Sequence, residues 1–232
     1  MKKALVTGAS SGLGRHISIK LAQKKIKVIG LARSQKKLAN LKKIIGNKYF
    51  DYFVVDLKKL NELEKISINI LKKEKFIDIL INNAGIYKKS DLLNFEINEI
   101  NDLIDTNLKA PIILTRLFSK TMKRKKKGWI INISSIAGKI PIENSSVYCA
   151  SKFGLYGFTS SLNKELKNYG ITVCTISPGG INTPLWKKIK YPGDIRRALQ
   201  PNDIFKIIEL ILNFGINVNF SEAVLLPRIE SF

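Results

Sequence analysis

The sequence predicts a doubly wound α/β fold, in which a parallel sheet of seven strands is flanked by helices on both faces. Short β-rich runs alternate with longer helical patterns along the whole chain, which is typical of stacked βαβ units. Most of the strand runs are almost continuously apolar, as expected when helices cover both faces of a sheet. No Gly/Ser-rich linker or internal repeat divides the 232 residues, so we expect one domain, residues 1–232.

The expected strands are short and rich in aliphatic side chains, and they span residues 4–7, 27–32, 52–55, 77–81, 129–134, 172–177 and 223–226. Apolar residues at three-to-four spacing predict helices that include residues 13–24, 60–73, 97–123 and 147–168. Asn107 and Pro111 should interrupt the third of these. The stretch of about residues 182–199 is the least regular, and it follows a strand end, where an α/β protein usually carries its substrate loop.

The formal net charge of +22 raises the question of a nucleic acid or an acidic membrane as partner. The basic residues are spread along the whole chain, and we find neither a zinc-finger spacing nor a basic-aromatic motif. The one dense run, residues 123–127, is expected to be a solvated loop. No apolar stretch reaches the roughly 18 residues of a membrane-spanning helix. We therefore expect no nucleic-acid partner and no membrane insertion.

The N-terminal apolar run is too short for a secretory signal, because Gly8 and the polar residues after it interrupt it. Cys149 and Cys174 have no metal-ligand spacing and form no disulfide framework. They are interpreted as small buried side chains in a reducing compartment. The expected location is the cytoplasm, and no metal site is expected.

A glycine-rich turn, Thr7-Gly8-Ala9-Ser10-Ser11-Gly12-Leu13-Gly14, joins the first expected strand to the first helix. Such a turn lets the backbone approach a pyrophosphate, and the free N–H groups of the helix terminus add favourable dipole charge. Taken alone, the glycines can also serve only close packing between strand and helix.

The end of the second strand, Leu31-Ala32-Arg33-Ser34, refines the expected dinucleotide. Enzymes that use NAD usually place a carboxylate there for the ribose 2′-hydroxyl, and this chain has none nearby. Arg33 can instead pair with a 2′-phosphate, assisted by the hydroxyl of Ser34 and by Lys37. We therefore predict NADP(H) as cofactor; the alternative is an arginine that is simply exposed.

Tyr148 and Lys152 are four residues apart on an expected helix, so their side chains face the same way. A neighbouring ammonium stabilises a phenolate, and we expect it to lower the pKa of Tyr148 from the ordinary value of about 10. Because lysine is abundant here, the pair alone is weak, and its context must decide.

Four further segments resemble the short-chain dehydrogenase/reductase family, a group of Rossmann-fold oxidoreductases, in order and in spacing. Asn82-Asn83-Ala84-Gly85 follows the fourth strand, and Asn107 lies in the next helix. Ile133-Ser134-Ser135-Ile136-Ala137-Gly138 resembles the serine segment of the family, and Pro178-Gly179 with Thr183 resembles the motif after the sixth strand. The resemblance covers nearly the whole chain.

The resemblance implies a catalytic set of Asn107, Ser135, Tyr148 and Lys152. Tyr148 would exchange a proton with the substrate oxygen, Ser135 would hydrogen-bond that oxygen, and Lys152 would bind the nicotinamide ribose. Asn107 would hold a water that relays protons to the lysine. The implied cofactor-binding residues also include Tyr148 and Lys152, together with Gly8, Ser10, Ser11, Gly12, Leu13, Gly14, Arg33, Ser34, Asp56, Leu57, Asn83, Ala84, Gly85, Pro178, Gly179, Ile181 and Thr183.

Several of these residues have a second interpretation. Asn107 can be a helix cap before Pro111, Ser134 can replace Ser135 as the active serine, and Asp56 can serve only to cap a helix. His16 and Trp129 are interpreted as structural.

The implied function is the interconversion of a small-molecule carbonyl and an alcohol by hydride transfer. From another class, a non-catalytic NADP-binding sensor or scaffold is the alternative. Basic and aromatic residues in the expected substrate loop suggest an anionic or carrier-bound carbonyl compound: Trp186, Lys187, Lys188, Lys190, Tyr191, Arg196 and Arg197. A homodimer or homotetramer is the family expectation, with a dimer built through the helices that carry Asn107 and Tyr148.

Overall fold

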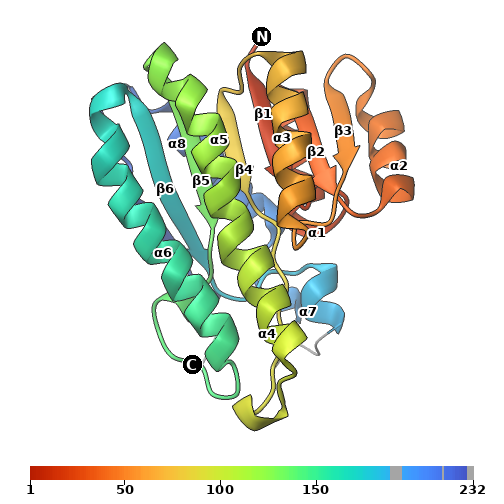
Figure 1. Ribbon diagram of the computed structural model, residues 1–232, viewed down its shortest axis with the longest axis vertical. Coiled ribbons are helices and arrows are strands. Elements are labelled where there is room, and N and C mark those ends of the chain that lie inside the picture. Colours follow the sequence, from red (N-terminus) through yellow and green to blue (C-terminus); the bar gives the residue numbers. More distant parts are fainter. Residues whose placement is uncertain (189–194, 216, 229–232) are drawn as a thin grey trace.

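The computed structural model describes residues 1–188, 195–215 and 217–228 (Figure 1). In these residues seven parallel strands form one sheet in the order β3-β2-β1-β4-β5-β6-β7. The strands are β1 (Lys3–Thr7), β2 (Lys27–Ala32), β3 (Phe50–Val54), β4 (Ile79–Asn82), β5 (Gly128–Ile133), β6 (Ile171–Pro178) and β7 (Glu222–Leu225). The predicted doubly wound α/β fold is confirmed, and each predicted strand lies within two residues of the observed one.

The direction in which the chain adds strands reverses next to β1. From β1 the chain moves outward to β2 and β3, then returns to β4 on the other side of β1 and continues outward to β7. Val6 of β1 is therefore in register with Gly30 of β2 and with Ile81 of β4. The loops after β1 and β4 diverge at this switch point, which opens a crevice at the carboxyl ends of the strands.

Helices cover both faces of the sheet, as expected for near-continuously apolar strands. They are α1 (Gly12–Gln23), α2 (Gln35–Ile45), α3 (Leu60–Glu74), α4 (Ile97–Ile104), α5 (Ala110–Lys125), α6 (Ser146–Leu166), α7 (Pro184–Lys188) and α8 (Pro201–Asn213). In Figure 1, α3, α5 and α6 lie in front of the sheet, and α1 and α8 lie behind it.

Each face has its own apolar core, because neighbouring residues of a strand point to opposite faces. Val6 packs in the cluster that includes Ile17 of α1 and Ile208 of α8. Leu5, the preceding residue of β1, packs in the cluster that includes Leu63 of α3 and Phe118 of α5. The two cores hold the carboxyl ends of the strands, and so the loops that follow them, in fixed positions.

The predicted helix 97–123 is interrupted where we expected. A π-helical segment, Asp105–Lys109, separates α4 from α5 and contains Asn107. Pro111 lies in the first turn of α5, where its missing N–H costs little. The prediction of a loop at residues 123–127 is partly wrong: Lys123, Arg124 and Lys125 form the last turn of α5, where cations are favourable to the helix dipole. All five residues are exposed.

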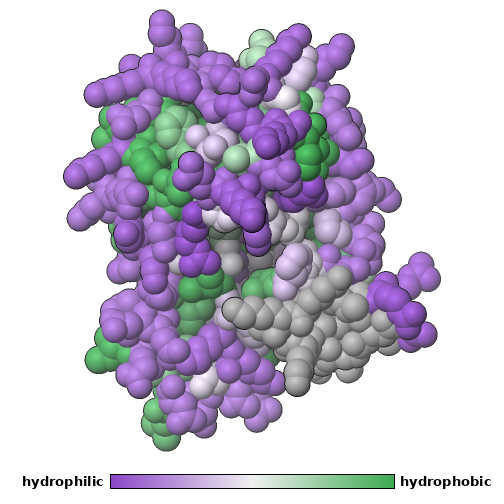
Figure 2. Space-filling view, turned by 90° about the vertical axis from the view of Figure 1, so that its right-hand side faces the viewer, coloured by the Kyte–Doolittle hydropathy of each residue, from purple (hydrophilic) through white to green (hydrophobic). Residues whose placement is uncertain are grey.

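The surface in Figure 2 is predominantly hydrophilic, in keeping with the abundance of lysine. Cys149 and Cys174 are buried free thiols, as expected. None of the helices in the described part of the chain has the length and apolarity needed to cross a membrane.

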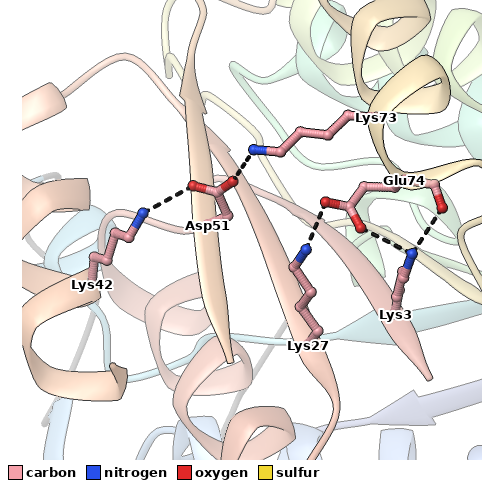
Figure 3. Close-up of polar contacts among 6 residues, drawn as sticks. All are labelled: Lys3, Lys27, Lys42, Asp51, Lys73 and Glu74. Carbon is pink, nitrogen blue, oxygen red and sulfur yellow. Dashed lines mark hydrogen bonds and ion pairs between the residues drawn. The ribbon is translucent and has the colours of Figure 1, made fainter. Parts of the chain in front are cut away.

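Ion pairs join the sheet and α3 at the opposite edge, where the strands begin (Figure 3). The buried carboxylate of Glu74, at the end of α3, lies 3.0 Å from Lys3 Nζ of β1 and 2.7 Å from Lys27 Nζ of β2. Burial acts to raise the pKa of Glu74, but hydrogen bonds from Lys27 and Lys3 hold it below its ordinary value. Asp51 of β3 similarly bridges Lys42 and Lys73.

Candidate active site

A pocket of about 400 Å³ lies at the carboxyl edge of the sheet, lined by the segments that follow β1 to β6. It brings together all the predicted site residues except Asn107. These lining residues are Gly8, Ser10, Ser11, Gly12, Leu13, Gly14, Arg33, Ser34, Asp56, Leu57, Asn83, Ala84, Gly85, Ser135, Tyr148, Lys152, Pro178, Gly179, Ile181 and Thr183.

The glycine turn needs its glycines for two different reasons. Gly8 and Gly12 have φ values of +68° and +50°, which side chains other than glycine rarely adopt. At Gly14 a Cβ would lie 2.4 Å from the carbonyl oxygen of Gly8, so only glycine permits this close approach. As a result α1 begins at Gly12 with its first turn lining the pocket, and its free N–H groups form a site for an anion.

The loop after β4 is tied to the glycine turn by Thr7. The hydroxyl oxygen of Thr7 accepts hydrogen bonds from the backbone N–H groups of Asn83 and Ala84, each at 2.9 Å. The side-chain amide of Asn83 donates to the carbonyl oxygen of Thr7 at 2.8 Å. These bonds hold the two loops of the switch point side by side, and both loops line the pocket.

The rim near the end of β2 carries positive charge. Arg33 is exposed, and its guanidinium has no ion pair within the described residues. Lys37 and Lys58 line the same region, with Lys58 Nζ 3.0 Å from Asp102. Ser34 has a structural role that we did not predict: its hydroxyl accepts a 3.4 Å hydrogen bond from the N–H of Lys37 and caps α2.

Asp56 does not cap α3, whose N-cap residue is Lys59. One carboxylate oxygen accepts a 3.3 Å hydrogen bond from the backbone N–H of Lys58, so the side chain stabilises the turn before α3. The same residue lines the pocket, next to the buried Leu57.

Tyr148 and Ser135 are in direct contact. Ser135 hydrogen-bonds to the phenol of Tyr148, and its hydroxyl also accepts a 3.2 Å bond from the N–H of Ala137. Ser134 is buried, and its hydroxyl donates to the carbonyl oxygen of Lys152 at 3.4 Å. Of the two serines left open by the sequence, Ser135 is therefore the one beside the phenol.

The expectation that Lys152 lowers the pKa of Tyr148 is wrong in this structure. Burial raises the pKa of Tyr148 to about 12, against a smaller lowering by the hydrogen bond with Ser135. Burial also lowers the pKa of Lys152 to about 8. The ammonium of Lys152 lies 5.7 Å from the centre of the Tyr148 ring and donates a 3.2 Å hydrogen bond to the carbonyl oxygen of Ile133. Desolvation is the main cause of the pKa shifts of both groups, and it cannot be predicted from the i,i+4 spacing.

Asn107 lies just behind the pocket wall and is buried. Its amide accepts a 2.9 Å hydrogen bond from the N–H of Ile86 and donates to the carbonyl oxygen of Ile86 at 2.9 Å and to Ser151 Oγ at 3.1 Å. A Cβ placed on Gly85 would lie 3.4 Å from Asn107 Oδ1 and 3.6 Å from Lys152 Nζ. Asn107 therefore lies near the lysine, within the π-helical segment and not at a helix cap.

Tyr87 lines the pocket and was missed by the sequence analysis. Its ring packs edge-to-face on Tyr148, with centroids 4.8 Å apart. The available signal was its position, two residues after Gly85 in a loop at the carboxyl end of a strand.

The predicted substrate loop is only partly described. Ile181 forms a parallel bridge with Leu199, which closes the base of the loop, and Trp186 of α7 lines the pocket. Lys190 and Tyr191 lie outside the described residues. His16 does not line the pocket; its ring packs against Phe205, and burial lowers its pKa. Trp129 packs against the core, as expected.

A family model described as short chain dehydrogenase matches residues 2–192. This match covers most of the chain and all the motifs described above. The chain belongs to the short-chain dehydrogenase family of oxidoreductases.

Curated relatives agree with this assignment. The 3-oxoacyl-[acyl-carrier-protein] reductase FabG of Buchnera aphidicola subsp. Schizaphis graminum is 38% identical over 188 residues, which cover 81% of this chain and 77% of the relative. An uncharacterized oxidoreductase of Staphylococcus saprophyticus is 33% identical over 229 residues, or 97% of both chains.

Among solved structures, a metagenomic short-chain oxidoreductase in complex with NADP is 31% identical, with a TM-score of 0.86 over 99% of this chain and 98% of that one. A serine dehydrogenase complexed with NADP+ is 27% identical, with a TM-score of 0.87 over 99% of this chain and 96% of that one.

Proposed function

We propose that this protein is an NADP(H)-dependent oxidoreductase that interconverts a carbonyl and an alcohol, with Tyr148 as the proton-transfer residue. The observation that carries the proposal is the pairing of Tyr148 with Ser135 in a pocket whose other end is a glycine turn. One domain, residues 1–232, would carry the function, with about residues 182–199 as the substrate loop. A cytoplasmic homodimer or homotetramer is the proposed assembly.

The residues of the pocket fit a dinucleotide phosphate. The free first turn of α1 would hold the pyrophosphate, with Gly8, Gly12 and Gly14 giving the backbone the close approach it needs. The guanidinium of Arg33, which has no ion pair within the described residues, would bind the 2′-phosphate together with Lys37. The NADP complexes of the solved relatives support this cofactor choice.

The remaining cofactor roles follow from position along the pocket. Asp56 and Leu57 would lie at the adenine, and Asn83, Ala84 and Gly85 would line the adjoining ribose. Ile181 and Thr183 would hold the nicotinamide carboxamide, with Pro178 and Gly179 supporting them. When bound, NADPH supplies the hydride for reduction of the carbonyl carbon.

Tyr148 would donate its phenolic proton to the carbonyl oxygen of the substrate. Its pKa, which burial raises to about 12, leaves the phenol protonated at neutral pH, as a proton donor requires. Ser135 would hydrogen-bond the same oxygen and stabilise the charge that develops on it. Lys152 would bind the nicotinamide ribose, and Asn107 would support the proton path that leads to Lys152.

The decisive experiment measures NADPH consumption with ketoacyl thioesters, quinones, steroids, sugars and simple ketones, with NADH in parallel. For a carbonyl that is reduced, Tyr148→Phe should lower kcat by roughly 10²–10⁴-fold, because the acid is lost while the ring remains. Tyr156→Phe, on the same helix but outside the pocket, is the matched control and should keep wild-type turnover. Undiminished turnover by Tyr148→Phe would eliminate the proposed acid.

The same screen separates the enzyme from a sensor. Binding of NADPH is followed by its fluorescence. If the wild type binds NADPH but consumes none with any carbonyl, a non-catalytic NADP-binding role replaces the proposed reaction.

A further inference from the structure

The substrate end of the pocket has an aromatic wall that the assigned catalytic residues do not account for. Tyr87, in the loop after β4, packs edge-to-face on Tyr148 with an angle of 89° between the rings. Trp186 of α7 lies on the other side, with its ring centre 6.1 Å from that of Tyr87 and tilted by 31°. Both Tyr87 and Trp186 line the pocket, so segments about a hundred residues apart in sequence meet at the phenol.

Tyr87 is held at both ends of its side chain. Its hydroxyl forms a 3.1 Å hydrogen bond with Ser145 Oγ, and Ser145 is fully buried at the start of α6. Its ring rests on Tyr148, within the 4.5–7 Å range of favourable aromatic pairs. A ring fixed in this way presents a constant surface to a ligand and also limits the movement of the Tyr148 phenol.

The charges of the pocket lie at its other end. The cations among the described lining residues are Arg33, Lys37 and Lys58, which follow β2 and β3, together with Lys152 beneath the phenol. Among the lining residues, the loop after β4 and α7 contribute the apolar and aromatic side chains of Ile86, Tyr87, Leu185 and Trp186. Arg196 and Arg197 are exposed, and neither is among the residues that line the pocket. Near the Tyr148 phenol the described lining thus combines the hydroxyl of Ser135 with apolar and aromatic side chains, which suit an apolar substituent on the carbonyl group.

We propose that Tyr87, together with Trp186, selects carbonyl compounds in which the carbonyl group carries a planar apolar substituent, and that Tyr87 positions Tyr148. This inference rests on the proposed carbonyl chemistry and names its substrate class. An aryl group next to the carbonyl can pack against the wall while its oxygen reaches Tyr148 and Ser135. A small alkyl group leaves the same ring surface without a contact.

The test compares two 1,2-diketones, 1-phenyl-1,2-propanedione and 2,3-butanedione, which differ only in that a phenyl group replaces one methyl group. We expect the wild type to favour the phenyl compound by at least about 10-fold in kcat/KM, since aromatic packing is gained in one complex only. Tyr87→Leu should remove most of this preference, with a higher KM for the phenyl compound and a kcat reduced several-fold for both. Tyr87→Phe keeps the ring and should retain the preference to within about 3-fold, because only the bond to Ser145 is lost.

A second variant and a matched control guard against effects on folding. Trp186→Leu should also weaken the preference, because it removes the second ring of the same wall. Tyr49→Leu makes the same kind of change at a partly exposed tyrosine outside the pocket and should leave both constants unchanged. NADPH binding, measured by fluorescence, reports whether each variant keeps a formed pocket.

The outcomes separate this inference from the proposed function. If Tyr87→Leu binds NADPH and keeps the wild-type ratio of the two kcat/KM values, the specificity role is overturned. Reduction of an acidic ketoacyl thioester but of neither diketone also overturns it, and the carbonyl reductase stands. A wild type that reduces no carbonyl at all removes the proposed function itself.

Discussion

The two edges of the sheet surround their lysines differently. At the amino edge, the partly exposed Lys3 and Lys27 share the buried carboxylate of Glu74 and hold its pKa below the ordinary value (Figure 3). At the carboxyl edge, Lys152 is more deeply buried, and within the described residues its ammonium has only the Ile133 carbonyl oxygen as a hydrogen-bond partner. Burial then lowers its pKa to about 8. At the amino edge each group with a shifted pKa is paired with an opposite charge, whereas the shift of Lys152 comes from burial, as is common at functional sites.

Lys152→Met, at the carboxyl edge, is expected to have the largest effect, with activity and stability changing in opposite directions. Activity should fall by at least about 100-fold, because the proposed ribose contact and the nearby charge are lost. The free energy of unfolding at pH 7 should rise by about 1–2 kcal/mol, because a desolvated ammonium is replaced by an apolar side chain. Denaturant unfolding monitored by circular dichroism, together with NADPH turnover, would test both effects.

The pH dependence of this difference has a defined sign. The pKa of Lys152 is about 8 when folded, against 10.5 ordinarily, so the unfolded chain binds more protons between these values. Wild-type stability should therefore rise relative to Lys152→Met as the pH increases from 8 to 10.5. A constant difference across that window would show that Lys152 keeps its charge in the folded protein.

Gly14→Ala tests how closely the carboxyl edge is packed. The new Cβ would lie 2.4 Å from the Gly8 carbonyl oxygen, so the turn must shift, and we expect a loss of about 2–3 kcal/mol together with weaker NADPH binding. Gly157→Ala, at an exposed position of α6 where a Cβ meets no atom within 4 Å, should instead stabilise the protein by about 0.5–1 kcal/mol. Equal stabilities of the two variants would contradict the role given to the turn.

Glu74→Gln tests the amino edge. The substitution keeps the volume but removes the negative charge between two lysines that are themselves partly exposed, so the expected loss is about 2 kcal/mol. The contribution of Glu74 to stability is present above its unfolded pKa near 4.5 and is lost as the pH falls through its lower folded value. The difference in stability from the wild type should therefore shrink in acid, and turnover at pH 7 should be unchanged.

Much of the fold could be predicted because its signals are local. Apolar runs located all seven strands, and the polar Asn107 with Pro111 marked the interruption between α4 and α5. The glycine turn could also be recognised from the sequence, because a positive φ or a close backbone approach excludes residues other than glycine. The site residues expected from the order of the motifs, except Asn107, all line one pocket.

The parts that could not be predicted depend on contacts between distant residues. The pKa of Tyr148 is governed by burial, which spacing on a helix does not reveal. The contact of Tyr87 with Tyr148 joins residues 61 positions apart and exists only because β4 ends at the edge of the sheet where α6 begins. Ser34 appeared free to bind a ligand, yet the adjacent helix uses its hydroxyl as a cap.

The π-helical segment Asp105–Lys109 gives the chain a local change of phase. One additional residue in a helical turn rotates everything beyond it by about 100° around the axis. Asn107 can thus face Ile86 and Ser151 while Leu114 and Phe118, further along, still face the sheet. Deleting a single residue here would prevent Asn107 and the two apolar residues from facing their partners at the same time. The π-helical segment therefore lets one continuous helical stretch contribute both a buried polar side chain and part of the apolar core.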